Sequence, residues 1–399
     1  MMMNKGLIDE PVKNDKFAIQ NYVDGISKFI LTCDTPMTMS IQGGWGSGKT
    51  SIMELVKNQI EDKVSDVIWF NTWQVSQFNL DDKLTYILLN RVINKVSGNQ
   101  YELKEKGVTI VKSLFEIGAA RLTAGASAKV LTPDAMGDDI VEKIVKLKET
   151  YAKVVKNKTG DDGRIVFFID DLDRLESKKV IELLEVLKIF LDCKNCVYVL
   201  ALDYNVVDNG VKDKYGANYT PEIGRSFFDK VVQVTFKMPV DNYNIKQYVE
   251  KYLKELDVNT EDEKLLDKYA GLIKHSVGNN PRTMKKIINN FYLLLCVLDK
   301  ETVKTEDDKL IAFALLCMQR KYDNIFNQIL ENAKNMDSNS ISELSNQGLS
   351  FIEALDVSEE EKEQIKCFVK DVYLAINNDE NTKISEEKLS TLKNILKFF

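Results

Sequence analysis

A glycine-rich segment at residues 43–51, with the sequence GGWGSGKTS, constrains this chain more than any other feature. From Gly43 to Thr50 it matches the pattern G-x-x-x-x-G-K-S/T of phosphate-binding loops. Glycines let backbone N–H groups surround a phosphate without obstruction by side chains. In such a loop Lys49 reaches the β- and γ-phosphates, and the Thr50 hydroxyl is placed to hold Mg²⁺. The segment therefore predicts a nucleoside triphosphate site.

The residues on both sides of this loop have the patterns that its function requires. Residues 37–42 alternate and contain β-branched side chains, which favours a strand, and residues 51–60 repeat apolar side chains at helical spacing. Such a helix directs the positive end of its dipole at a bound phosphate. These flanks favour a functional loop over a chance glycine-rich turn. The residues predicted to bind the nucleotide are Gly43, Gly44, Trp45, Gly46, Ser47, Gly48, Lys49, Thr50 and Ser51.

A second group of chemically active residues follows the apolar run 165–169, which predicts a parallel strand covered on both faces. The run leads directly into Asp170, Asp171 and Asp173. Isolated buried charges are costly, so we expect these carboxylates at the exposed carboxyl end of the strand, beside a cation. We assign Asp170 to Mg²⁺, through water, and Asp171 to the polarisation of the attacking water. A solvated acidic turn is the alternative interpretation.

Three further residues are candidate catalytic groups, and each has a second interpretation. Asp203 follows the apolar run 196–202, where it either acts on the γ-phosphate or its water, or caps the next helix. Arg225 is either an arginine finger for a neighbouring subunit's site or a plain surface residue. Arg282 begins an amphipathic helix, and there it is a candidate lid arginine that contacts phosphate and moves with the hydrolysis state.

Strands that alternate with helices up to residue 240 predict an α/β fold with a parallel sheet. We expect a nucleotide-binding core at 1–240 with a helical insertion at 100–160, a helical lid at 241–299 and a C-terminal helical domain at 300–399. An amphipathic helix is expected at 78–99. The five predicted strands lie at residues 37–42, 66–71, 165–169, 196–202 and 231–236.

Composition narrows the classes of function. The net charge of −7 argues against a globally basic surface for nucleic acid, although a local basic patch is compatible with it. His275 is the single histidine, which nearly removes triad hydrolases and multi-histidine metal enzymes, and we expect it at a helix end. Cys193 and Cys196 are the only close pair of cysteines, so no second pair completes a zinc site.

The chain has no predicted signal peptide and no apolar run long enough to span a bilayer. The insertion at 100–160 is interrupted by charged residues, which argues against a membrane hairpin. We therefore expect a cytoplasmic protein without a membrane partner.

Five segments, taken in order, resemble the KAP family of P-loop NTPases. The most specific are 44–51, similar to the family's tryptophan-bearing P-loop, and 168–175, similar to its metal-binding strand. The others are residues 70–73, 199–203 and 228–234. The resemblance implies an ATP-preferring NTPase core, a five-stranded parallel sheet, and a strand ending at Asp203 between the P-loop strand and the metal-binding strand. It also implies an association with phage exclusion and related defence.

The leading hypothesis is an ATP-binding, Mg²⁺-dependent molecular switch whose hydrolysis of ATP controls assembly of a homo-oligomer or recruitment of an effector protein. One alternative is a non-hydrolysing scaffold with a structural nucleotide, because Asp171 is one methylene shorter than the usual glutamate. A second alternative is a motor stimulated by nucleic acid, against which the acidic composition and the lack of an aromatic-basic stretch count.

Overall fold

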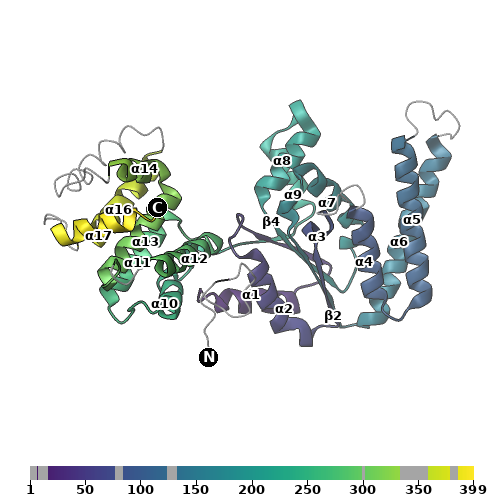
Figure 1. Ribbon diagram of the computed structural model, residues 1–399. Helices are drawn as coiled ribbons and strands as arrows, with labels where there is room; N and C mark the ends of the chain where they lie inside the picture. Colours follow the sequence, from purple (N-terminus) through teal and green to yellow (C-terminus); the bar gives the residue numbers. More distant parts are fainter. Residues whose placement is uncertain are drawn as a thin grey trace. The chain divides into compact units, whose positions relative to one another are not determined.

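The computed structural model describes Leu7 and residues 17–76, 84–123, 133–298, 302–332, 358–377 and 385–399. Two compact units make up the chain (Figure 1). Residues 20–238 belong to an α/β unit, and residues 239–399 belong to a helical unit together with Leu7 and residues 17–19. The nucleotide-binding motifs of the sequence therefore all lie in the α/β unit.

The α/β unit is built around a five-stranded sheet with the order β2-β3-β4-β1-β5, and every neighbouring pair of strands is parallel. The strand β4 separates β1 from β3, which is the arrangement that the family resemblance implies. Every residue of β3 and β4 is buried, which explains their continuous apolar runs. The predicted fold class is thus confirmed. The strands are β1 Met37–Gln42, β2 Asp66–Asn71, β3 Ile165–Asp170, β4 Cys196–Leu202 and β5 Val234–Lys237.

Helices cover both faces of this sheet (Figure 1). Alternate residues of β3, namely Ile165, Phe167 and Ile169, belong to one apolar cluster with side chains from α4 to α9. The helices α1 and α2 pack against each other on the other face. The helices of this unit are α1 Gln20–Thr32, α2 Lys49–Ile60, α3 Thr72–Ser76, α4 Leu84–Ser97, α5 Tyr101–Thr123, α6 Pro133–Thr159, α7 Ser177–Leu191, α8 Tyr204–Tyr215 and α9 Pro221–Asp229.

The segment expected to form a helical insertion contains α5 and α6, which lie side by side next to α4 (Figure 1). Within the ranges given above, no helix is long and apolar enough to cross a membrane. The helix expected at 78–99 is α4, which begins at Leu84, and residues 77–83 lie outside the described residues.

One predicted strand is wrong in its position. The fifth strand begins at Val234, whereas the prediction began it at Val231. The backbone N–H groups of Val231 and Val232 donate to the Phe228 carbonyl, so they continue the last turn of α9. Both side chains are buried, and a short apolar run does not distinguish a buried helix end from a strand.

The helical unit packs around α13 (Glu306–Lys321), whose residues from Leu310 to Met318 are all buried. The helices α11, α12, α14, α16 and α17 contact it. The described residues 241–298 and 302–332 therefore share one core, and the lid role of 241–299 stays a prediction. The other helices of this unit are α10 Ile245–Glu255, α11 Glu263–Ser276, α12 Pro281–Val297, α14 Asp323–Asn332, α16 Glu359–Asn377 and α17 Glu386–Leu396.

Candidate functional site

The glycine-rich loop joins the end of β1 to the start of α2, which is the strand-loop-helix context that the motif requires. Gly46 and Gly48 have φ values of 83° and 97°, a left-handed conformation that favours glycine. At Gly43 a Cβ atom would lie only 2.6 Å from Ser47 Oγ and 2.9 Å from Met238 Cγ. The loop therefore needs glycine at these positions for its conformation and for close packing.

The Lys49 side chain lies at the first position of α2 and is only 7% exposed. Its ammonium group donates to the carbonyls of Gly43, at 2.7 Å, and Gly44, at 3.2 Å. It also forms an ion pair with Asp173, with 2.7 Å between Nζ and Oδ2. The lysine of the loop is therefore held at the carboxyl end of the sheet, next to the acidic segment.

Thr50 and Asp170, which are 120 residues apart in the chain, are direct neighbours. The Thr50 hydroxyl donates to Asp170 Oδ1 at 3.2 Å, and the backbone N–H of Asp171 donates to the same oxygen at 2.9 Å. The other oxygen, Oδ2, is buried and has no hydrogen-bond partner among the described residues. The structure thus brings together the two residues that the sequence assigned to Mg²⁺.

The chemistry of this pair fits a magnesium ion. A hydroxyl and a carboxylate are hard oxygen ligands, and Mg²⁺ is usually bound by one or two carboxylates together with substrate phosphates. Burial, followed by the negative charge of Asp171, raises the pKa of Asp170 to about 6. A bound cation would stabilise the ionised form of Asp170, and the unpartnered oxygen Oδ2 could coordinate it. No group of three or more His, Cys, Asp or Glu side chains able to hold a metal occurs within the part described.

Asp171 is fixed from two sides. Its Oδ2 accepts a hydrogen bond from Asn71 Nδ2 at 2.7 Å, and its Oδ1 lies 2.6 Å from Arg174 Nε in an ion pair. The Arg174 guanidinium in turn lies over the Trp73 ring, with 4.6 Å to the centroid. Asp171 has a φ of 60° and a ψ of 26°, a left-handed conformation that costs a non-glycine residue about 1–3 kcal/mol and is concentrated at functional sites.

Sequence reasoning assigned no role to Asp173 and Arg174, although both lie in the acidic segment that it singled out. For Asn71, at the end of β2, the sequence suggested a hydrogen bond near the site but no partner, and the structure identifies Asp171 as that partner. In the sheet Asn71 pairs in register with Asp170, which places its side chain beside the aspartates. The register of β2 and β3 accounts for the contact of Asn71, and the short helix after β3 accounts for those of Asp173 and Arg174.

The remaining candidates have different surroundings. The Asp203 carboxylate accepts from the Asn205 backbone N–H at 3.0 Å and caps α8, as one of its two interpretations expects. Arg225 lies on α9, and among the described residues it forms no ion pair or hydrogen bond with the loop or the aspartates. Arg282 lies at the start of α12 in the helical unit. The phosphate-sensing, finger and lid roles of these residues stay predictions.

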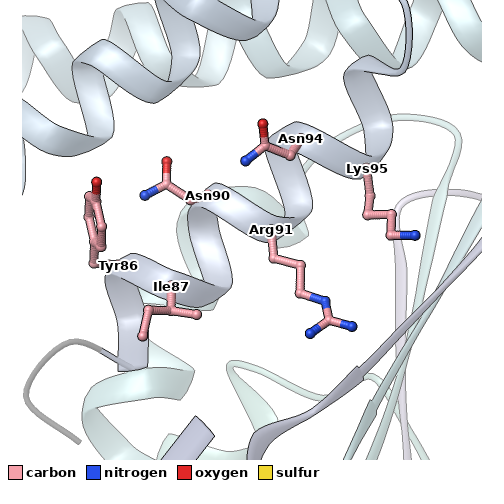
Figure 2. A pocket seen from close by; sticks show the side chains of 6 residues that line it. All are labelled: Tyr86, Ile87, Asn90, Arg91, Asn94 and Lys95. Atoms are coloured by element: carbon pink, nitrogen blue, oxygen red, sulfur yellow. The ribbon is translucent and has the colours of Figure 1, made fainter. Parts of the chain in front are cut away.

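A separate pocket of 460 Å³ lies along α4 (Figure 2). The Arg91 guanidinium, one of its lining groups, lies 5.6 Å from the centroid of the Phe70 ring. None of the residues predicted to bind nucleotide lines this pocket, so it is distinct from the phosphate-binding loop. Its lining residues are Tyr86, Ile87, Asn90, Arg91, Asn94 and Lys95.

Comparison with known proteins agrees with the geometry. The KAP family P-loop domain matches residues 19–297, more than half of the chain. The Phage T7 exclusion protein of Escherichia coli (strain K12) is 21% identical over 259 residues, which are 58% of this chain and 34% of that protein. The chain thus spans about a third of this relative's length. A solved structure, described as Drosophila ORC bound to GC-rich DNA and Cdc6, aligns with 90% of this chain. The alignment covers 48% of the matched chain, with 9% identity and a TM-score of 0.35.

Proposed function

The chain belongs to the KAP family of P-loop NTPases, and from this premise we propose that it is an ATP-binding and Mg²⁺-dependent ATP-hydrolysing molecular switch. The observation that carries the proposal is the hydrogen bond of 3.2 Å between Thr50 and Asp170. It joins the phosphate-binding loop to the acidic end of β3, so that one triphosphate–metal complex can contact both.

In this proposal the backbone N–H groups of the loop and Lys49 bind the phosphates, and Thr50 and Asp170 hold the magnesium ion. When bound, the ion supplies positive charge that neutralises the phosphate oxygens during transfer. The positive end of α2 lies at the same place and favours the same charge.

Asp171 is the group that orients and activates water. The water oxygen forms a bond to the γ-phosphorus, the bond from this phosphorus to the β–γ bridging oxygen breaks, and ADP leaves with that electron pair. The water gives a proton to Asp171 or to the phosphate. The contacts of Asp171 with Asn71 and Arg174 support this role, because a general base needs a fixed orientation.

The output of the switch is a change in assembly or in partner recruitment. The α/β unit and the helical unit each have their own packed core, which supports a change in their relation when nucleotide binds or leaves. The similarity to the Phage T7 exclusion protein supports a role in defence against phage. We place this activity in the cytoplasm, with a homo-oligomer or an effector protein as the partner.

The turnover of ATP tests the catalytic part of this proposal. Wild-type protein should hydrolyse ATP only with Mg²⁺, and both Lys49→Ala and Asp171→Ala should lower turnover by about 10²-fold or more. Equal turnover by all three proteins would refute the assignment. A mass measurement with and without a slowly hydrolysed ATP analogue tests assembly, and a mass that does not respond would remove the oligomeric form of the switch.

One observation favours a second candidate, a non-hydrolysing scaffold with a structural nucleotide. Both carboxylate oxygens of Asp171 have protein partners, Asn71 and Arg174. Unless one partner is released, Asp171 has less capacity to accept a proton from water. Nucleotide that stays bound through purification, together with negligible turnover, would support the scaffold.

A further inference from the structure

The ammonium group of Lys49 has all of its donors engaged by the protein itself. It contacts two loop carbonyls, those of Gly43 and Gly44, and the carboxylate of Asp173. An ammonium has three N–H donors, so these three partners occupy them. The side chains of Lys49 and Asp173 are 7% and 6% exposed, so water contributes little to their solvation.

This arrangement has to change when a triphosphate binds. In the proposed function Lys49 contacts the β- and γ-phosphates, and the Asp173 carboxylate now lies 2.7 Å from the same nitrogen. A carboxylate at that distance would lie close to the phosphate oxygens, and like charges in a buried site repel each other. Either Asp173 turns away or Lys49 exchanges its partner.

The surrounding charges single out Asp173 for this exchange. Asp170 is linked to Thr50, and Asp171 is linked to Asn71 and Arg174. Asp173 is the carboxylate that pairs with Lys49 among the described residues. It lies in the short helix η4 (Leu172–Arg174), next to Arg174, which is the ion-pair partner of the proposed catalytic base.

We propose that Asp173 is the internal counter-ion of Lys49 and sets the affinity of the site for nucleotide. Asp173 neutralises Lys49 when no nucleotide is bound, and it competes with the triphosphate for this lysine. This inference rests on the proposed nucleotide site and adds a positioning residue to it. When the nucleotide leaves, Asp173 pairs with Lys49 again, so that no buried charge stays unpaired.

The binding of ATP and ADP to Asp173→Asn, measured by calorimetry in the presence of Mg²⁺, tests this proposal without relying on catalysis. We expect ATP to bind about tenfold more tightly or better than to wild type, because the variant loses a competing negative charge within hydrogen-bond distance of Lys49. The gain should be smaller for ADP, which lacks the γ-phosphate. Asp173→Glu keeps the charge and should stay within a few-fold of wild type.

Asp62→Asn is the matched control, because it removes the same charge from an exposed position at the far end of α2. The 12-residue helix α2 is about 18 Å long and begins at Lys49, and Asp62 follows two residues after its end. This control should bind ATP as wild type does. If Asp173→Asn folds only with nucleotide present, the dissociation rate of a fluorescent ATP analogue gives the comparison, and slower release than from wild type is expected.

Two results separate this inference from the proposed function. If Asp173→Asn binds ATP as weakly as wild type or more weakly, while Lys49→Ala binds worse than wild type, the counter-ion proposal is overturned and the nucleotide site stands. If Lys49→Ala binds ATP as well as wild type does, the nucleotide site itself is overturned.

Discussion

The substitution Asp170→Asn should stabilise the nucleotide-free protein at neutral pH while it removes the proposed metal ligand. Asp170 is 1% exposed, and burial and the charge of Asp171 raise its pKa from 3.8 to about 6. A raised carboxyl pKa means that the folded protein binds the proton more tightly than the unfolded chain. The ionised carboxylate therefore destabilises the fold.

The size of this effect follows from linkage between protonation and folding. The gap between 3.8 and about 6 corresponds to about 3 kcal/mol of unfolding free energy. The stabilising contribution of protonated Asp170 is fully present below pH 3.8 and is lost as the pH rises through about 6. At pH 8 the variant should be more stable than wild type by up to about 3 kcal/mol, and the difference should disappear toward pH 4.

Urea unfolding followed by tryptophan fluorescence measures this difference, with EDTA present and nucleotide absent. All three tryptophans, Trp45, Trp69 and Trp73, belong to the α/β unit, so the signal reports the unit that contains Asp170. Asp62→Asn should show no such gain. If Asp170→Asn has the same stability as wild type at pH 8, or the gap does not shrink toward pH 4, the physical account of the Asp170 environment is wrong.

Three further substitutions test the rest of the site. Gly43→Ala should weaken ATP binding about tenfold or more, because a Cβ would lie 2.6 Å from Ser47 Oγ; calorimetry that gives a wild-type Kd would contradict this. Asn71→Ala should lower kcat about tenfold with little change in KM, because Asp171 loses a hydrogen bond of 2.7 Å; a change confined to KM would argue against the positioning role. Asp203→Ala should cost about 1 kcal/mol of unfolding free energy through the lost cap of α8 and leave ATP affinity unchanged, and a large drop in affinity would favour its phosphate-sensing interpretation.

The parts of the site that the sequence predicts well are those in which local backbone chemistry leaves little choice. The left-handed conformations of Gly46 and Gly48 require glycine, and the continuous burial of β3 requires an apolar run that ends at the first aspartate. Each of these features is determined by a few neighbouring residues, so a pattern of residue spacing is enough to predict it.

The parts that the sequence did not predict depend on contacts between distant segments. The hydrogen bond between Asn71 and Asp171 follows from the pairing of β2 with β3, and the ion pair of Lys49 and Asp173 joins the loop to η4. A single sequence does not contain these registers. The predicted start of the fifth strand was wrong because Val231 is buried just after α9, and a buried residue there gives the same apolar pattern as a strand.

Electron paramagnetic resonance of Mn²⁺, used in place of Mg²⁺ with a slowly hydrolysed ATP analogue, tests the central claim most directly. The claim is that the loop and the aspartates bind one triphosphate–metal complex, as the contact between Thr50 and Asp170 indicates. Wild-type protein should bind Mn²⁺ tightly only with nucleotide present and then show the spectrum of protein-bound Mn²⁺. The variants Thr50→Ala and Asp170→Asn should each lose that signal. A signal that survives in either variant, or that forms without nucleotide, would contradict the account.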